Sequence, residues 1–161
     1  MPIAPKTLQT RFRVPLRSKV YGYILAGLAT AGLVDSTLLT QEHYSDIILP
    51  CSVTQGCETV LNSKYSEVFG IPLAVLGLVF YFSVLLATLY FVQSGRDWLK
   101  KLLLAMGVVG FVSSLGLVYI QGVVIKAWCQ YCLISALSST LIFVFAALLY
   151  TTKKEKPHEE A

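Results

Sequence analysis

Four cysteines in two pairs are the residues of this sequence that are best suited to chemistry. Five residues separate Cys51 from Cys57, and two separate Cys129 from Cys132 in the segment "WCQYC". Thiolates bind metal ions, and paired thiols form and exchange disulfides. The pattern therefore leaves three kinds of site open: a metal clip, a pair of structural disulfides, or a redox centre.

The position of Cys129 favours a reactive thiol. It stands where a loop meets a long apolar stretch, so it is expected at the start of a helix. The first amides of a helix have no partner within the helix, and their positive dipole favours a thiolate. Such a thiolate attacks disulfides readily, and a disulfide that contains it is easily exchanged. Redox exchange between the two pairs is the favoured interpretation.

Two other interpretations of the cysteines remain open. A zinc site could use all four thiolates, but the gap from Cys51 to Cys57 is wider than is usual for paired zinc ligands. On the side of the membrane where the cysteines are expected, only His43 could add a ligand. Two inert disulfides could staple a loop. A membrane helix bundle holds together without such staples, so the need for them is weak.

The rest of the chain must place these thiols in a membrane. Of its 161 residues, 55% are hydrophobic and only 14% are charged, with a mean hydropathy of +0.67. A spanning helix needs roughly 20 mainly apolar residues. Four stretches qualify, at about 20–40, 70–93, 102–125 and 129–150. The sequence predicts an all-α membrane protein: a four-helix transmembrane bundle in a single domain, 1–161, with an extended outer loop at 41–69.

The basic residues predict the orientation of the bundle. Five Lys and Arg precede the first span, three lie in the 94–101 loop and three in the tail, whereas the other two loops hold one each. The positive-inside rule places both termini in the cytoplasm. The 41–69 loop and the 126–128 connection then lie outside, with all four cysteines on the extracytoplasmic side of the cell (inner) membrane, where disulfides persist.

The positions of the basic residues argue against a cleaved signal peptide and against nucleic-acid binding. The first span follows a basic segment, as a signal peptide would, but its apolar run is longer and no cleavage site stands out, so we expect a retained anchor. The net charge of +4 does not indicate nucleic-acid binding, because the basic residues flank membrane spans rather than form one soluble face.

The order of several motifs resembles a known family. The segment "PCSVTQGCETVLNSKYSEVFGIPLAVLGLVFY" (50–81), followed some distance later by "WCQYC", is similar to the vitamin K epoxide reductase family in its compact prokaryotic form. The resemblance rests on the loop cysteine pair, a serine six residues after the second cysteine (Ser63), Gly-Ile-Pro at the start of the second span, and the late Cys-x-x-Cys. It covers about 20–150.

This resemblance implies a four-helix bundle around a quinone, of the ubiquinone or menaquinone class, with no metal. It implies that Cys132 is the thiol nearest the quinone and that Cys129 is its exchange partner. Cys57 would pass electrons to Cys129, and Cys51 would meet the external substrate. Ser63 would lie near the quinone pocket and help to orient the loop.

The function implied is that of a membrane thiol oxidoreductase that oxidises a thioredoxin-fold (DsbA-like) partner and reduces a membrane quinone, supporting disulfide formation. We expect the partner to be a separate protein, because the chain ends in a polar tail. Animal enzymes of the family carry a tyrosine four residues after the last cysteine, where this chain has Ala136. The alternatives are an epoxide or quinone reductase using the same relay, and a non-enzymatic tetraspan scaffold with a disulfide-stabilised loop.

Several polar residues within the spans are weaker candidates. Asp35 lies in the first span, where an ionisable group is costly; it could handle quinone protons, or the segment "DST" (35–37) could simply reach the outer interface. Glycines 22, 27 and 32 predict a small-residue face suited to close helix packing. Possible pocket residues are Ser113, Ser114, Tyr119, Ser135, Ser138 and Ser139.

Overall fold

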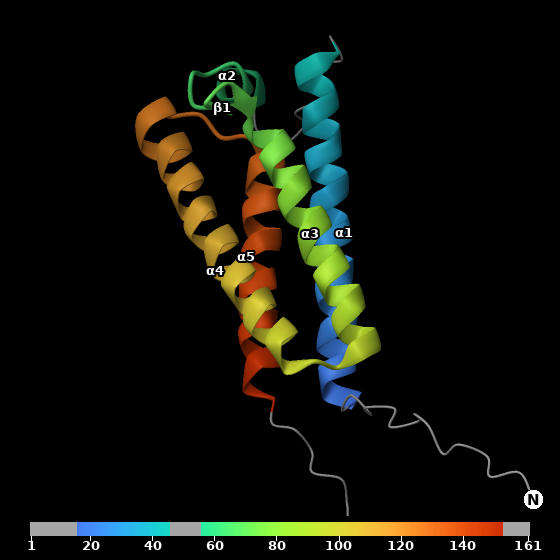
Figure 1. Cartoon of the computed structure of the whole chain (residues 1–161). Coiled ribbons are helices and arrows are strands. Elements are labelled where there is room, and N and C mark those ends of the chain that lie inside the picture. The colour runs from blue at the N-terminus through green and yellow to red at the C-terminus, as the bar shows by residue number, and fades with distance from the viewer. Residues whose placement is uncertain (1–15, 46–55, 153–161) are drawn as a thin grey trace, which may run out of the picture.

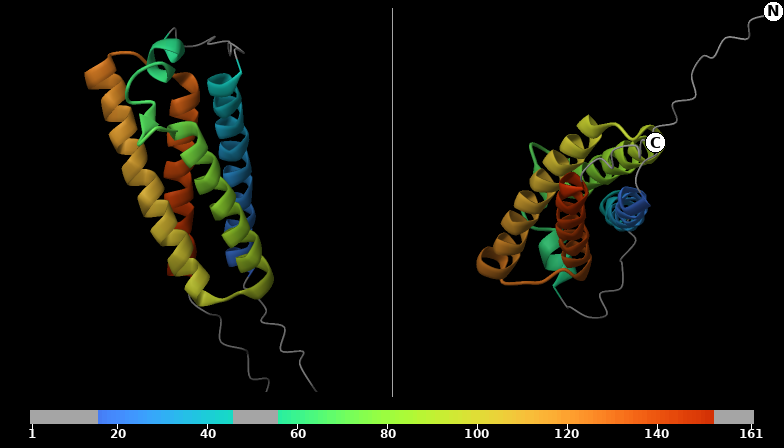
Figure 2. Two further views of the ribbon diagram at one scale, coloured as in Figure 1. Left: turned by 45° about the horizontal axis from the view of Figure 1, so that its top comes forward. Right: turned by 90° about the horizontal axis from the view of Figure 1, so that it is seen from below.

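The computed structural model describes residues 16–45 and 56–152. Within these residues, four long helices form an elongated bundle (Figure 1). They are α1 (Leu16–Tyr44), α3 (Leu73–Ser94), α4 (Asp97–Tyr119) and α5 (Gln130–Thr151). The helix α4 continues directly into a π-helical segment, η1 (Ile120–Ile125). The bundle leads from α1 to α3 and α4 and back to α5, which packs against both α4 and α1 (Figure 2).

The four long helices of the described residues, with η1 counted as part of α4, are long and apolar enough to cross a membrane. Large apolar side chains stay exposed on the outside of the bundle, such as Val109 (62%) and Leu137 (61%). Such a surface suits lipid, because apolar side chains cost nothing there. The predicted all-α membrane bundle is confirmed, and the protein is an integral membrane protein.

The predicted start of the third span was wrong. The helix α4 begins at Asp97 rather than near residue 102, so Lys100 and Lys101 lie in its first turns and not in a loop. The reason is local: Gly95 adopts a left-handed conformation (φ 63°), and its N–H closes α3 on the carbonyl of Phe91. Only Gly95 and Arg96 connect the two helices, and Asp97 in the first turn suits the helix dipole.

Close packing of α1 depends on small residues. Its buried positions recur every three or four residues, which is the spacing of a helix packed along one seam. They are Ser18, Gly22, Leu25, Ala29, Gly32, Asp35, Ser36 and Leu39. A Cβ on Gly32 would overlap the ring of Tyr81 from α3. Gly27, in contrast, has no neighbour within 4 Å, so its place in the predicted small-residue face was wrong.

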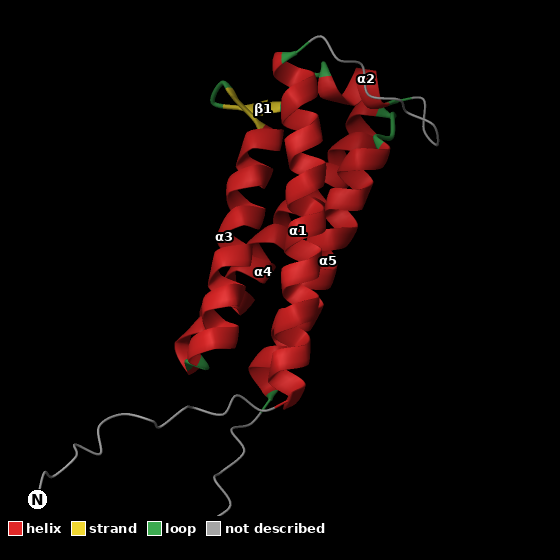
Figure 3. Ribbon diagram, turned by 90° about the vertical axis from the view of Figure 1, so that its right-hand side faces the viewer, coloured by secondary structure: helices red, strands yellow, loops and turns green. Residues whose placement is uncertain are grey.

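The loop between α1 and α3 folds over the end of the bundle where α5 begins, which we call the cysteine end. It contains a short helix, α2 (Cys57–Leu61), and an antiparallel hairpin of β1 (Glu67–Val68) and β2 (Ile71–Pro72) (Figure 3). Residues 46–55 of the predicted 41–69 loop lie outside the described residues, and α1 extends to Tyr44.

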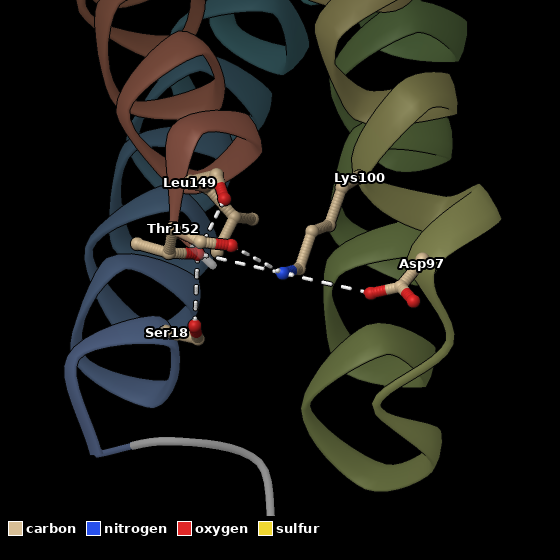
Figure 4. A network of polar contacts seen from close by, with 5 residues as sticks. All are labelled: Ser18, Asp97, Lys100, Leu149 and Thr152. Atoms are coloured by element: carbon tan, nitrogen blue, oxygen red, sulfur yellow. Dashed lines mark hydrogen bonds and ion pairs between the residues drawn. The ribbon is translucent and has the colours of Figure 1, made fainter. Parts of the chain in front are cut away.

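A buried lysine ties three helices together at the opposite end of the bundle (Figure 4). The Nζ of Lys100 donates to the carbonyl oxygen of Thr152 over 3.1 Å and to its hydroxyl over 3.4 Å. It also lies 3.6 Å from a carboxylate oxygen of Asp97. The Thr152 hydroxyl contacts that of Ser18 at 3.1 Å. Since Thr152 caps the end of α5, the lysine charge also faces the negative end of that helix.

Replacing Lys100 with methionine is expected to destabilise the bundle by about 1–3 kcal/mol, because charge-assisted hydrogen bonds to Thr152 are lost. The thermal unfolding midpoint in detergent micelles measures this. Lys101→Met is the matched control, since Lys101 is exposed in the same helix, and its midpoint should stay at the parent value. Equal midpoints for the two variants would show that the network does not hold the helices together.

Candidate active site

Cys129 and Cys132 meet at the start of α5. Cys129 is the residue that caps the helix, and its sulfur accepts the backbone N–H of Cys132 over 3.5 Å. Both thiols are free, and Cys129 is fully buried. The two side chains therefore lie one turn apart on a helix start, as expected from the spacing in the sequence.

The surroundings of Cys129 lower its pKa. The hydrogen bond from the Cys132 thiol has the largest effect, and the backbone amides of Cys132 and Tyr131 add to it. Burial and the negative charge of Asp35 act in the opposite direction. A lowered thiol pKa favours the thiolate, which is the nucleophile in disulfide exchange. The result agrees with the reactive thiol predicted for this position.

The buried side chain of Gln121 fixes the backbone of Cys129. Its Oε1 accepts the N–H of Cys129 over 3.1 Å, and its own carbonyl accepts the N–H of Ala127 over 3.1 Å. The chain turns here because Lys126 adopts a left-handed conformation (φ 57°) after η1. π-Helical segments occur frequently at functional sites. The sequence interpretation missed Gln121, although a lone amide inside an apolar span was a visible signal.

Replacing Gln121 with leucine is expected to slow oxidation of the Cys129–Cys132 pair by quinone about 10-fold, because a catalytic group displaced by a fraction of an ångström reacts more slowly. The buried N–H of Cys129 would also lose its acceptor. Stopped-flow oxidation of the reduced protein by ubiquinone-1 measures the rate. Gln93→Leu, at an exposed position of α3, is the control; a parent-like rate in Gln121→Leu would argue against this positioning role.

The loop brings a third cysteine to this pair. Cys57, the first residue of α2, is disulfide-bonded and only 2% exposed. It forms one buried cluster with Val60 and Cys129. Cys51 lies outside the described residues. A disulfide sulfur is no zinc ligand, and within the described part of the chain no three His, Cys, Asp or Glu side chains gather around a possible metal position.

Gly56 lets the loop rest directly on the backbone before Cys129. A Cβ at this position would lie 2.8 Å from the amide nitrogen of Trp128, 2.9 Å from its carbonyl oxygen and 3.0 Å from the Cβ of Ala127. Backbone atoms cannot swing aside as the end of a flexible side chain can. The absence of a side chain at Gly56 is therefore what allows Cys57 to approach Cys129.

A cavity of about 570 Å³ opens beside Cys132. Residues from all four long helices and from the loop line it, including Ser63. Its volume is within the usual range for small-molecule pockets. The hydroxyl of Ser63 donates to the carbonyl of Val60 over 2.7 Å, at the end of α2. Both residues expected to face a quinone, Cys132 and Ser63, thus line the same cavity.

Tyr81 is a buried residue of the cavity wall that carries a polar group. Its hydroxyl donates to the carbonyl of Ser135 over 2.7 Å and lies 2.8 Å from the hydroxyl of the same residue. Nearby, the hydroxyls of Ser114 and Ser139 are 2.5 Å apart. Of the pocket residues expected from the sequence, four line the cavity: Ser113, Ser114, Ser135 and Ser139. Tyr119 is 62% exposed. Tyr81 was missed because a tyrosine in an apolar run resembles a core aromatic.

A contact between His43 and Glu67 joins α1 to the hairpin beside the cavity. His43, in the last turn of α1, places its Nε2 3.6 Å from a carboxylate oxygen of Glu67 in β1. His43 also lines the cavity. The contact fixes the hairpin to the end of α1, and so helps to hold the loop over the cysteine end.

Comparison with models of protein families gives a match. A model of the vitamin K epoxide reductase family matches residues 23–147, which is most of the chain. The matched region contains all four cysteines and the residues that line the cavity. A search of curated protein sequences found no match.

Proposed function

The chain belongs to the vitamin K epoxide reductase family and is a membrane oxidoreductase, and we propose that it carries electrons from an external protein dithiol to a membrane quinone. Cys57 is the link to the outside, Cys129 receives the electrons from it, and Cys132 delivers them to the quinone. We assign Cys51, the remaining cysteine of the sequence, as the partner of Cys57 in this relay. The outcome is a disulfide in the donor protein.

One observation carries this proposal: a disulfide-bonded Cys57 is buried against a free Cys129 whose neighbour Cys132 lines a cavity. Disulfide exchange needs direct approach of one sulfur to another, and the shared cluster of Cys57 and Cys129 supports it by holding the two residues in one neighbourhood. A quinone headgroup needs an apolar pocket with a few polar groups. The cavity supplies Ser63, Tyr81 and Ser135 at its wall.

The electrons follow three balanced steps. A donor dithiol attacks the Cys51–Cys57 disulfide and leaves with a disulfide of its own, while both loop thiols become reduced. The Cys57 thiolate then attacks a Cys129–Cys132 disulfide, which restores the loop disulfide and reduces the inner pair. Finally the inner pair gives two electrons and two protons to the quinone, forming a disulfide and a quinol. The bonding in the structure, with Cys57 oxidised and the inner thiols free, corresponds to the state before this last step.

We propose a separate thioredoxin-fold protein as the donor and the extracytoplasmic face of the cell (inner) membrane as its site of action. Lys100 and Lys101 lie at the end of the bundle opposite to the cysteines, where α1 begins and α5 ends (Figure 1). By the positive-inside rule that end faces the cytoplasm. The cysteine end then faces the compartment in which disulfides persist.

The side chain at position 136 in the cavity wall favours quinone reduction over epoxide reduction. Ala136 lines the cavity one turn after Cys132, at the position where animal members of the family carry a tyrosine. A methyl group has no proton to give to an epoxide oxygen. Vitamin K epoxide should therefore turn over much more slowly than ubiquinone or menaquinone in the same assay, and equal rates would support the epoxide alternative.

The test of the function is an anaerobic count of thiols. Fully reduced protein is mixed with one equivalent of ubiquinone or menaquinone, then quenched with a mass-tagged maleimide and run beside Cys132→Ala. Two thiols should disappear from the parent and none from the variant. If the count never changes in the parent, the cysteines are a structural element and the enzymatic proposal fails.

A further inference from the structure

Asp35 is the ionisable residue among the buried positions of α1. It lies directly beside Ser36, and both residues fit the spacing of three and four along the packing seam. It is only 6% exposed, within a membrane-spanning helix. A carboxylate in such a place is costly and is a functional candidate by default.

Three contacts place Asp35 at the same depth as Cys132. Gly32, one turn before Asp35 on α1, lies against the ring of Tyr81. The hydroxyl of Tyr81 bonds to Ser135 on α5. Because α5 runs opposite to α1, Cys132 lies one turn from Ser135 toward the cysteine end, as Asp35 lies one turn from Gly32 in the same direction. The two helices pack against each other, so Asp35 and Cys132 lie at the same level along the axis of the bundle.

The electrostatics and hydrogen bonding of Asp35 agree with this placement. Its charge acts on Cys129, on Cys132 and on Tyr81. One carboxylate oxygen, Oδ2, is buried and has no hydrogen-bond partner within the described residues. An unpartnered buried acceptor costs free energy. A buried carboxylate oxygen that receives no hydrogen bond is suited to taking up a proton.

We propose that Asp35 is the proton carrier of the Cys129–Cys132 pair during its oxidation by quinone, an inference that rests on the proposed function. As the inner pair forms its disulfide, the S–H bond of Cys132 breaks and two electrons pass to the quinone. The carboxylate of Asp35 takes the proton of Cys132 and passes it on to a quinone oxygen. The second proton, which Cys129 lost when it became a thiolate, reaches the other quinone oxygen from solvent. The products are one disulfide and one quinol, and Asp35 returns to the carboxylate.

Other titratable groups surround this path. Tyr81 faces it from α3, and Cys129 and Cys132 face it from the start of α5. Glu42 and His43 lie further along α1 and line the cavity. Of these groups, Asp35 is the carboxylate at the depth of the inner pair. It does not itself line the cavity, but its neighbour Ser36 does.

The experiment compares Asp35→Asn and Asp35→Glu with the parent in single-turnover oxidation of the pre-reduced protein by ubiquinone-1 across a range of pH. We expect Asp35→Asn to slow the step about 100-fold, the usual size of an acid–base contribution, and Asp35→Glu to retain most of the rate. The parent rate should fall toward acidic pH as two groups, Asp35 and Cys129, become protonated. The rate of Asp35→Asn should fall with the protonation of Cys129 alone. Thr37→Val, exposed on the same helix, is the control.

A merely structural role would give a different result. It predicts that Asp35→Asn and Asp35→Glu are slowed equally at every pH and that both unfold at lower temperature. That outcome, or a parent-like rate and pH profile in Asp35→Asn, would overturn the proposal. A parallel Cys132→Ala reaction separates this failure from that of the proposed function. If Cys132→Ala still reduces quinone, the relay itself is wrong; if it does not, only the role of Asp35 is lost.

Discussion

Cys129→Ser is expected to lower the turnover of an external dithiol with quinone at least about 1,000-fold, because loss of the nucleophile removes a covalent step that no other group can supply. Cys129 is the thiol that lies in one buried cluster with Cys57. Its lowered pKa makes it a good leaving group when the loop disulfide re-forms and releases Cys129 from the mixed disulfide with Cys57. Serine keeps the size of the side chain, and its hydroxyl can still cap α5.

The assay follows quinone absorbance with dithiothreitol or a reduced thioredoxin-fold protein as donor, in detergent. Ser94→Ala, at the end of α3 away from the cysteines, is the control and should keep the parent rate. The unfolding midpoint of Cys129→Ser should stay close to the parent value. A folded Cys129→Ser protein that turns over at more than a tenth of the parent rate would show that electrons reach the quinone by another route.

Gly56→Val is expected to separate the two halves of the reaction. The added side chain would lie within 2.8 Å of the Trp128 backbone, so the loop must lift and carry Cys57 away from Cys129. A displacement of about 1 Å can cost roughly 100-fold in rate when two groups must react directly. Turnover with the protein donor should fall by about that factor. Direct oxidation of the pre-reduced inner pair by ubiquinone-1 should stay close to the parent rate.

Both rates are measured on the same preparation, with the donor in one assay and pre-reduced protein in the other. Gly27→Val is the matched control, because a side chain at Gly27 meets nothing within 4 Å. Its two rates should both match those of the parent. If Gly56→Val changes neither rate, or lowers both equally, the contact of the loop with the Trp128 backbone does not govern the exchange.

Local properties of the chain were enough to predict much of this protein. A run of about 20 apolar residues meets the thickness of a bilayer wherever it occurs, so the four spans and the all-α fold followed from the sequence. A separation of two residues brings Cys129 and Cys132 together on any helix start. The same is true of the family, since the order of its motifs is a property of the sequence itself.

Other features needed the folded chain because they depend on which faces meet. The burial of Cys57 against Cys129 joins residues far apart in sequence, and Gly56 permits it only because the Trp128 backbone passes there. Gln121 and Tyr81 looked like ordinary residues of apolar spans until the π-helical turn and α5 gave them partners. Asp35 could have faced the interface.

The sequence by itself determined a four-helix membrane bundle, because apolar length acts locally along the chain, and it predicted that the four cysteines lie on one side of that bundle. The tertiary structure decided that Cys57 and Cys129 share one buried cluster, which polar groups line the cavity, and that Asp35 is buried. The physical reason is that burial, close approach and hydrogen-bond partners are properties of pairs of elements. A helix alone does not specify what packs against it.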